Sequence, residues 1–151
     1  MWENAVVAYL HYLSFMVIYA ALAVENQTFK QELSAAEAWR VAIADGIYGL
    51  SATTVLITGI LRVFYFGKGS GFYASNPVFW TKVGLFFFVA VLSLYPTFSF
   101  ISWFRDLRNN NAPQIGRAQA HWISNLIKVE LVGFAIIPLL GALMARGIGG
   151  N

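Results

Sequence analysis

Residues 79–103 read FWTKVGLFFFVAVLSLYPTFSFISW, and this stretch decides the fold. Its one charged residue is Lys82, and the run is long enough to cross the hydrocarbon core of a bilayer, which takes about 20 residues in a helix. Three more stretches have the same character: residues 4–24, 38–63 and 122–145. The chain is therefore predicted to be an all-α integral membrane protein, with a bundle of four transmembrane helices in a single membrane domain over residues 1–151.

The composition excludes several classes of protein. Hydrophobic residues make up 58% of the 151 residues and charged residues 11%, and the mean hydropathy is +0.62. A soluble domain carries about a quarter charged residues, and a globule of this size cannot hide so much apolar surface inside. A soluble enzyme, a disordered chain and a nucleic-acid-binding protein are excluded. Since there is no cysteine, so are disulfides, thiol catalysis and cysteine-ligated metals.

Local signals mark the ends of the spans. An indole ring prefers the lipid–water interface, and all five tryptophans fall at predicted span ends: Trp2, Trp39, Trp80, Trp103 and Trp122. Ser34 followed by Glu37 predicts a capping box at the start of the second helix. Asn76 followed by Pro77 predicts the N-cap and first turn of the third. The glycine-rich residues 67–71 predict a flexible turn between them.

Four spans place both termini on one side of the membrane, together with residues 67–71. The opposite side carries more basic residues: Lys30, Arg40, Arg105, Arg108, Arg117 and Lys128. By the positive-inside rule, the loops after the first and third spans are predicted to be cytoplasmic and the termini to face outward. The predicted location is a bacterial inner membrane, or another energy-transducing membrane.

Small residues predict how the helices associate, because helices in lipid depend on close backbone approach. The second helix has the longest series: Ala38, Ala42, Gly46, Gly49 and Thr53. It is therefore expected at the centre of the bundle, with Gly133 and Gly141 of the fourth helix forming another seam. Pro96 and Pro138 lie inside spans and are predicted to kink or loosen them.

Ionisable side chains inside the spans are the candidate functional residues, because their burial in a bilayer costs free energy. At 1.5 Å per residue, His11 lies about 10 Å and Lys82 about 5 Å below the surface on the side of the termini. Arg62 ends the second span on the same side, so the three residues form one candidate site. The alternatives are that His11 only hydrogen-bonds a neighbouring helix, and that Lys82 and Arg62 extend to the interface.

A second candidate cluster contains Asp45 and Glu130, about 9 and 12 Å in from the opposite surface by the same helical rise. Asp45 is either a partner of Arg40 or Lys128 or an acid with a function of its own. Glu130 is the deepest carboxylate. It is neutral, paired with a base, or part of a proton path.

A haem held by one chain would depend on His11. His121 lies at the opposite membrane face, about 20 Å away, so the two histidines cannot ligate the same iron. His11 would act alone, or with Lys82 or a backbone or water ligand. Aromatic residues of the third helix would either line a porphyrin or quinone pocket or face lipid: Phe86, Phe87, Phe88, Phe98 and Phe100.

Several segments carry a resemblance that covers the whole chain: DGIYGL (45–50), GILRVF (59–64), GKG (67–69), Tyr73, SNPVFWTK (75–82), IPLL (137–140) and MARG (144–147). Together they resemble a family of small four-helix bacterial membrane proteins, a domain of unknown function. This resemblance implies the membrane bundle and no particular activity.

The order of the helices also resembles, more weakly, the four-helix, haem-associated bacterial protoporphyrinogen oxidase. That resemblance implies a first-helix histidine at His11 and an aromatic-plus-lysine entry at Trp80 and Lys82. It also implies a fourth-helix glutamate at Glu130. Tyr95-Pro96 departs from it, because that family tends to have Tyr-His there.

Two hypotheses of function follow. In the first, the protein is a haem- or porphyrin-linked redox protein with haem b or a porphyrin as cofactor. His11 is the axial metal ligand, Lys82 with Trp80 beside it holds a propionate or substrate carboxylate, and Glu130 moves protons. In the second, it is a non-catalytic subunit or assembly factor of a larger respiratory or photosynthetic membrane complex. Its partners are the lipid bilayer, other subunits or a second copy of the chain.

Overall fold

The computed structural model describes residues 2–149, and within them the chain is helical without a β-strand. The four long helices of this range are α1 (Trp2–Thr28), α2 (Ala35–Leu61), α4 (Pro77–Ser102) and α6 (Arg117–Ala145). Shorter elements connect them: η1 (Arg62–Phe66), a π-helix that continues α2, then α3 (Ser70–Ala74) and α5 (Phe104–Arg108). Each long helix, extended by η1 or α5 where these follow it, is long and apolar enough to cross a membrane. The predicted four-helix membrane bundle is confirmed.

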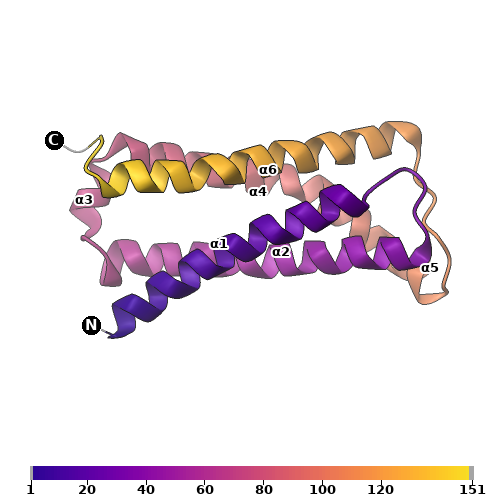
Figure 1. Cartoon of the computed structure of the whole chain (residues 1–151), viewed down its shortest axis with the longest axis horizontal. Coiled ribbons are helices and arrows are strands. Elements are labelled where there is room, and N and C mark those ends of the chain that lie inside the picture. Colours follow the sequence, from indigo (N-terminus) through magenta and orange to yellow (C-terminus); the bar gives the residue numbers. More distant parts are fainter. Residues whose placement is uncertain (1, 150–151) are drawn as a thin grey trace.

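Both ends of the chain lie at one end of the bundle, together with α3 (Figure 1). We call this the terminal end. The connections formed by residues 29–34 and 109–116 lie at the other end, which we call the loop end. Each helix starts before the span predicted for it, and α1 continues four residues beyond position 24, to Thr28.

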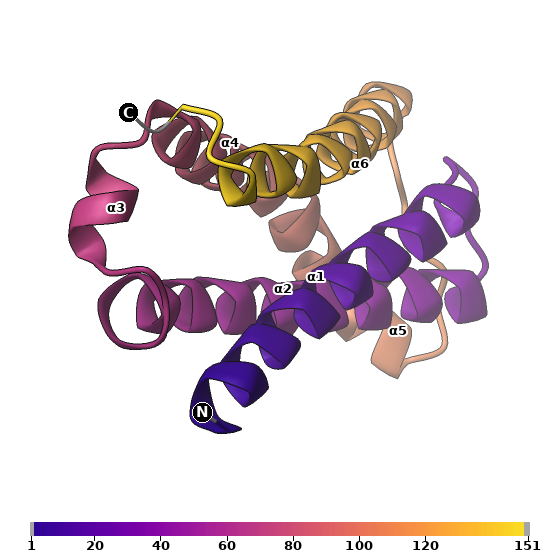
Figure 2. The same ribbon diagram turned by 60° about the vertical axis from the view of Figure 1, so that its left-hand side comes forward.

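The bundle consists of two helix pairs. α1 packs along α2, and α4 packs along α6, while contacts between the pairs are fewer (Figures 1 and 2). The expected central position of α2 is wrong, because Gly46 and Gly49 are exposed and no atom lies within 4 Å of a Cβ placed on either. The seam expected at Gly133 and Gly141 forms at Gly133 alone: a Cβ there would lie 2.5 Å from Val89 Cγ2, whereas no atom lies within 4 Å of one placed on Gly141. Glycine thus lets α6 approach α4 closely.

An aromatic core closes the loop end. Phe100 and Trp103 are 1% and 4% exposed, and the Trp103 ring is stacked on Phe29 with an interplanar angle of 5°. The interface position expected for Trp103 is therefore wrong: the residue does end α4, but its ring faces inward. The rings of Trp2 and Trp122 are exposed, as an interface position requires.

The predicted helix starts are confirmed. Ser34 Oγ accepts a hydrogen bond from the Glu37 amide, and Glu37 Oε2 accepts one from the Ser34 amide at 2.9 Å. Asn76 Oδ1 accepts from the amide of Val78 at 2.9 Å, with proline in the first turn of α4. Residues 67–71 form a more defined turn than expected, because Gly69 takes a φ of +90° and α3 begins directly after it.

Two prolines lie inside long helices that continue on either side of them. Pro96 is buried in α4 and Pro138 is exposed on α6. Pro96 has no amide hydrogen, so it cannot donate to the carbonyl of Leu92 one turn earlier. The kinks expected from these prolines stay a prediction.

Candidate functional site

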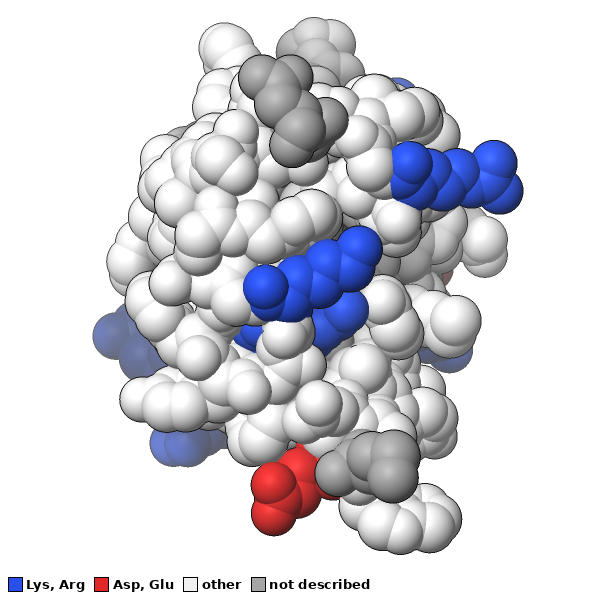
Figure 3. All heavy atoms as spheres, turned by 90° about the vertical axis from the view of Figure 1, so that its left-hand side faces the viewer, with Lys and Arg blue, Asp and Glu red and all other residues white. Residues whose placement is uncertain are grey.

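A cavity of about 440 Å³ lies between the two helix pairs at the terminal end. We call it the cationic cavity, because His11, Arg62 and Lys82 line it. Much of the remaining wall is aromatic: Phe15, Tyr73, Phe79, Trp80, Phe86 and Phe87. Figure 3 looks onto this end and shows basic side chains near the centre of the face, one of them recessed behind another. The structure thus brings together the three residues predicted to share the first site, with Trp80 beside them.

The protonation of the His11 ring follows from its partner Thr58. Thr58 Oγ1 donates its single hydrogen to a backbone carbonyl, with Thr54 O at 2.6 Å as the nearer acceptor. The same oxygen lies 2.9 Å from His11 Nδ1, and with the Thr58 hydrogen used within its own helix we assign the His11 tautomer that carries its hydrogen on Nδ1. Nε2 is then the nitrogen with the free lone pair.

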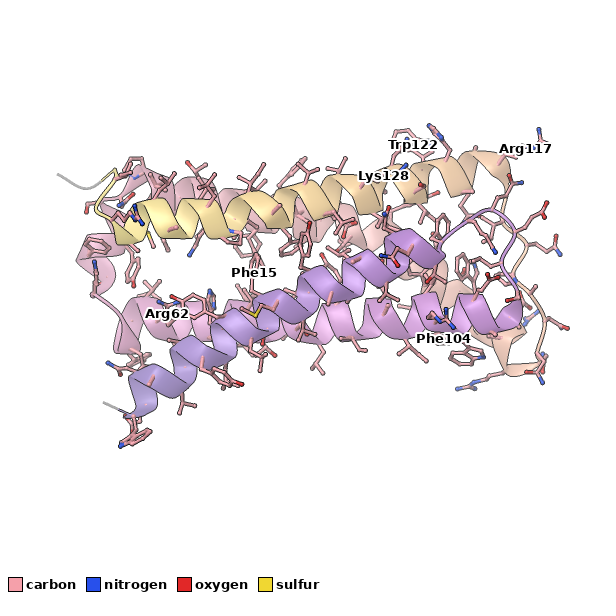
Figure 4. The ribbon with its side chains drawn as sticks, in the orientation of Figure 1. Phe15, Arg62, Phe104, Arg117, Trp122 and Lys128 are labelled. Atoms are coloured by element: carbon pink, nitrogen blue, oxygen red, sulfur yellow. The ribbon has the colours of Figure 1, made fainter. Side chains whose placement is uncertain are left out.

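Arg62 is held against α1 by Tyr12. Its Nη2 donates to the Tyr12 hydroxyl at 3.2 Å, and the guanidinium lies 5.0 Å from the centre of the Tyr12 ring. Figure 4 shows Arg62 on the α2 side of the bundle and Phe15 reaching from α1 toward α6. Lys82 is half-buried. Within residues 2–149 the one ion pair joins Lys30 and Glu37 on the surface, so no carboxylate pairs with Arg62 or Lys82.

A second polar group, the acidic cluster, lies in the half of the bundle nearer the loop end. It contains Glu25 of α1, Asp45 of α2 and Glu130 of α6, which are 1%, 7% and 1% exposed. The charges of Asp45 and Glu130 are both close enough to act on Glu25. The Tyr48 hydroxyl faces Glu130, and Thr97 Oγ1 of α4 donates to Asp45 Oδ1 at 2.7 Å. All four long helices therefore contribute to this cluster.

Most of the acidic cluster lacks hydrogen-bond partners. Glu25 Oε1, Tyr48 Oη and Glu130 Oε1 are buried and unbonded. The pairing of Asp45 with Arg40 or Lys128 considered from the sequence is wrong, because both basic side chains are exposed and neither forms an ion pair. In the part of the chain that the structure describes, no three carboxylate or histidine side chains are placed to hold a metal ion.

The structure separates Glu130 from the residues predicted to act with it. Glu130 does not line the cationic cavity, whereas His11 and Lys82 do. Sequence reasoning missed Glu25, which lies just after the predicted span end at residue 24, and Tyr48. Tyr48 follows Asp45 by three residues on the same face of α2, and this spacing is the signal that could have found it.

The second histidine lies where the helical rise placed it. His121 is exposed near the start of α6 at the loop end, with Nε2 2.9 Å from Asn125 Nδ2. It belongs to neither polar group. The two histidines of the chain therefore cannot share one ligand.

Comparison with known protein families gives the classification of this bundle. The model of a family described as "Predicted membrane protein (DUF2214)" matches residues 3–149. The chain belongs to this family. Membership confirms the resemblance to small four-helix membrane proteins of unknown function. No curated protein and no solved structure matches this DUF2214 chain, so the weaker resemblance to the protoporphyrinogen oxidase stays a prediction.

Proposed function

We propose that the protein binds haem b or another porphyrin in the cationic cavity and acts as a redox protein of an energy-transducing membrane, such as the bacterial inner membrane. The observation that carries the proposal is the free lone pair of His11 Nε2 at an aromatic cavity. The Nδ1–H bond to Thr58 fixes the ring and increases the basicity of Nε2, which is how second-shell groups support histidine ligands.

The wall of the cavity suits a flat aromatic ligand. Its volume of about 440 Å³ lies within the range of about 300–1,000 Å³ found for small-molecule sites, which are mostly apolar with a few placed polar groups. The Trp80 ring is fixed because its Nε1 donates to the Ala74 carbonyl at 2.9 Å. It would therefore serve as a wall rather than a hydrogen-bond donor to the ligand.

The two free cations would hold acidic groups of the ligand. Among residues 2–149, no carboxylate pairs with Arg62 or Lys82, and a porphyrin carries carboxylates that can bind them. Lys82 would hold a propionate or a substrate carboxylate. The bound group would supply the electron-transfer chemistry, and Glu130 would handle protons from its place outside the cavity wall.

Absorption spectra of the purified protein test this proposal. The protein, isolated in mild detergent from cells supplied with haem precursors, is expected to show a Soret band. His11→Ala is expected to lose or shift that band, because the axial ligand is removed. His121→Ala is the matched control and is expected to leave the band unchanged. A colourless wild-type protein that also fails to take up added haemin, or a band indifferent to His11→Ala, would contradict the proposal.

A second candidate function rests on the outward face of α2. Gly46 and Gly49 are exposed, and the space above both is open, so a helix of another protein can approach the backbone there. This favours a non-catalytic subunit or assembly factor of a larger membrane complex. Size-exclusion and pull-down experiments in mild detergent would then show a stable complex that Gly46→Leu disrupts. A pigmented monomer that is indifferent to Gly46→Leu favours the redox protein.

A further inference from the structure

The acidic cluster is independent of the cationic cavity, and its charge has to be compensated within the bundle. Three carboxylates from three helices are 1–7% exposed, and Asp45 and Glu130 lie within electrostatic range of Glu25. Three negative charges at this burial would be strongly unfavourable without a counter-charge, because the interior replaces water with a low-dielectric medium.

Neither of the common counter-charges is available. The groups that face the cluster are carboxyls from α1, α2 and α6, the Tyr48 phenol, and the hydroxyls of Ser93 and Thr97 on α4. None of these groups is a cation, and within the described residues no lysine or arginine pairs with a member. The donor groups are also not arranged as a metal site, as residues 2–149 hold no such constellation. Protons are the remaining ligand.

The hydrogen-bond partners of the three acids indicate which of them are protonated. Asp45 Oδ1 accepts from Thr97 Oγ1 at 2.7 Å, and such a bond stabilises the ionised form of a carboxyl group more than the neutral form. Within residues 2–149, Glu25 Oε1 and Glu130 Oε1 form no hydrogen bond although each residue is 1% exposed, and the Tyr48 hydroxyl that faces Glu130 is itself unbonded. An ionised carboxylate left without donors costs the full loss of its hydration, whereas a neutral carboxyl costs far less.

We propose that the acidic cluster is a proton-binding site, in which Glu25 and Glu130 each hold a proton at neutral pH while Asp45 carries the negative charge. Both helix pairs contribute to it, with Glu25 and Asp45 on α1 and α2 and Glu130 on α6. Loss of the protons places like charges across the junction of the two pairs, where inter-helix contacts are fewest. Proton occupancy therefore controls how firmly the pairs dock.

Infrared spectroscopy of the full chain in bilayers tests the proposal. At neutral pH the wild-type protein is expected to show two C=O stretching bands of neutral carboxylic acids, which shift when the sample is exchanged into D₂O. Glu25→Gln and Glu130→Gln are each expected to remove one band. Glu37→Gln is the control, because Glu37 is a surface residue paired with Lys30, and it is expected to leave both bands.

The pH dependence of stability gives a second readout. The folded state holds more protons than the unfolded state, so stability falls as pH rises from about 4.3, where the glutamates of the unfolded chain ionise, until the folded protein releases its protons. Each proton increases the unfolding equilibrium constant about tenfold per pH unit over this range. The double variant of Glu25→Gln and Glu130→Gln is expected to lose this dependence.

Two results would overturn the proposal. One is a wild-type spectrum without neutral carboxyl bands at neutral pH in a buffer free of metal ions. The other is a pair of bands that neither glutamine variant changes. If Glu25→Gln fails to fold, the wild-type spectrum and Glu130→Gln still decide. None of these measurements involves a porphyrin, so their outcome is independent of the proposed function.

Discussion

The cationic cavity and the acidic cluster occupy opposite halves of the same bundle. At the terminal end, Arg62 and Lys82 are half-buried beside the cavity, and neither pairs with a carboxylate of the part of the chain that the structure describes. Toward the loop end, Glu25 and Glu130 are 1% exposed and the helices close around them. The difference concerns how a charge can be compensated. An open cavity leaves its cations for an external anion, whereas a sealed site admits little more than protons.

The largest effect is expected in a labelling experiment, which tests whether the two ends of the bundle lie on opposite sides of the membrane. The chain has no cysteine, so Thr28→Cys and Ser70→Cys each introduce the only thiol. The two positions lie near the loop end and the terminal end respectively. A membrane-impermeant thiol reagent should label them from opposite sides, with Ser70→Cys reached from outside, as the positive-inside rule predicts. Labelling after solubilisation is the control for reactivity. Labelling of both from one side would show that the bundle does not span the membrane as described.

A core substitution tests the difference in packing between the two ends. Phe100→Ala removes a ring that is 1% exposed and lies 5.0 Å, centre to centre, from Trp103. It is expected to lower the free energy of unfolding by about 3–5 kcal/mol, because the loop end cannot collapse into the space. Phe87→Ala at the cationic cavity, where the ring is 49% exposed, should cost about 1 kcal/mol or less. Denaturant titration in detergent measures both, and equal losses would contradict the packing difference.

Thr58→Val sharpens the description of the cationic cavity. It removes the acceptor of the His11 Nδ1–H bond and keeps the shape of the side chain. Affinity for the porphyrin should fall about 10–100-fold, the usual effect of losing a second-shell partner of a ligating histidine. Titration with haemin measures it. Thr53→Val is the matched control, because Thr53 is exposed and donates to the Gly49 carbonyl of its own helix. Equal affinities of the two variants would mean that Thr58 does not position His11.

The smallest expected effects distinguish the helix caps at the two ends. Asn76 caps α4 at 0% exposure, and its Nδ2 also donates to the Ile148 carbonyl at 3.4 Å. Asn76→Ala should cost about 1–2 kcal/mol of unfolding free energy, since an N-cap and a tertiary bond are lost together. Ser34→Ala removes an exposed cap of α2 and should cost about 0.5–1 kcal/mol. Thermal unfolding of the two variants measures this order, and the reverse order would show that the contact with Ile148 contributes nothing.

Much of the candidate site followed from the sequence, since helical rise alone placed His11, Arg62 and Lys82 within about 10 Å of the same membrane surface. The sequence also placed Asp45 and Glu130 in a second group, but the redox hypothesis still combined Glu130 with His11, and Glu130 does not line the cavity that contains His11. Depth along a helix does not specify which face of the helix is turned inward. Glu25 was missed for a related reason. A span predicted from hydropathy stops before the first charged residue, whereas α1 continues to Thr28 and the Glu25 side chain is buried inside the bundle.

The amino-acid sequence was enough to predict the four helices and the capped starts of α2 and α4, whereas α6 begins five residues before the span predicted for it. A chain in lipid has to satisfy its backbone hydrogen bonds internally, and apolar stretches of this length leave the helix as the solution. Caps such as Ser34 and Asn76 act over three residues, so they can be read locally. The tertiary structure alone decided the pairing of α1 with α2 and of α4 with α6, the burial of Trp103, and the meeting of Glu25 with Glu130. In lipid both faces of a helix are apolar, so periodicity does not mark the inner face, and close backbone approach at residues such as Gly133 selects it.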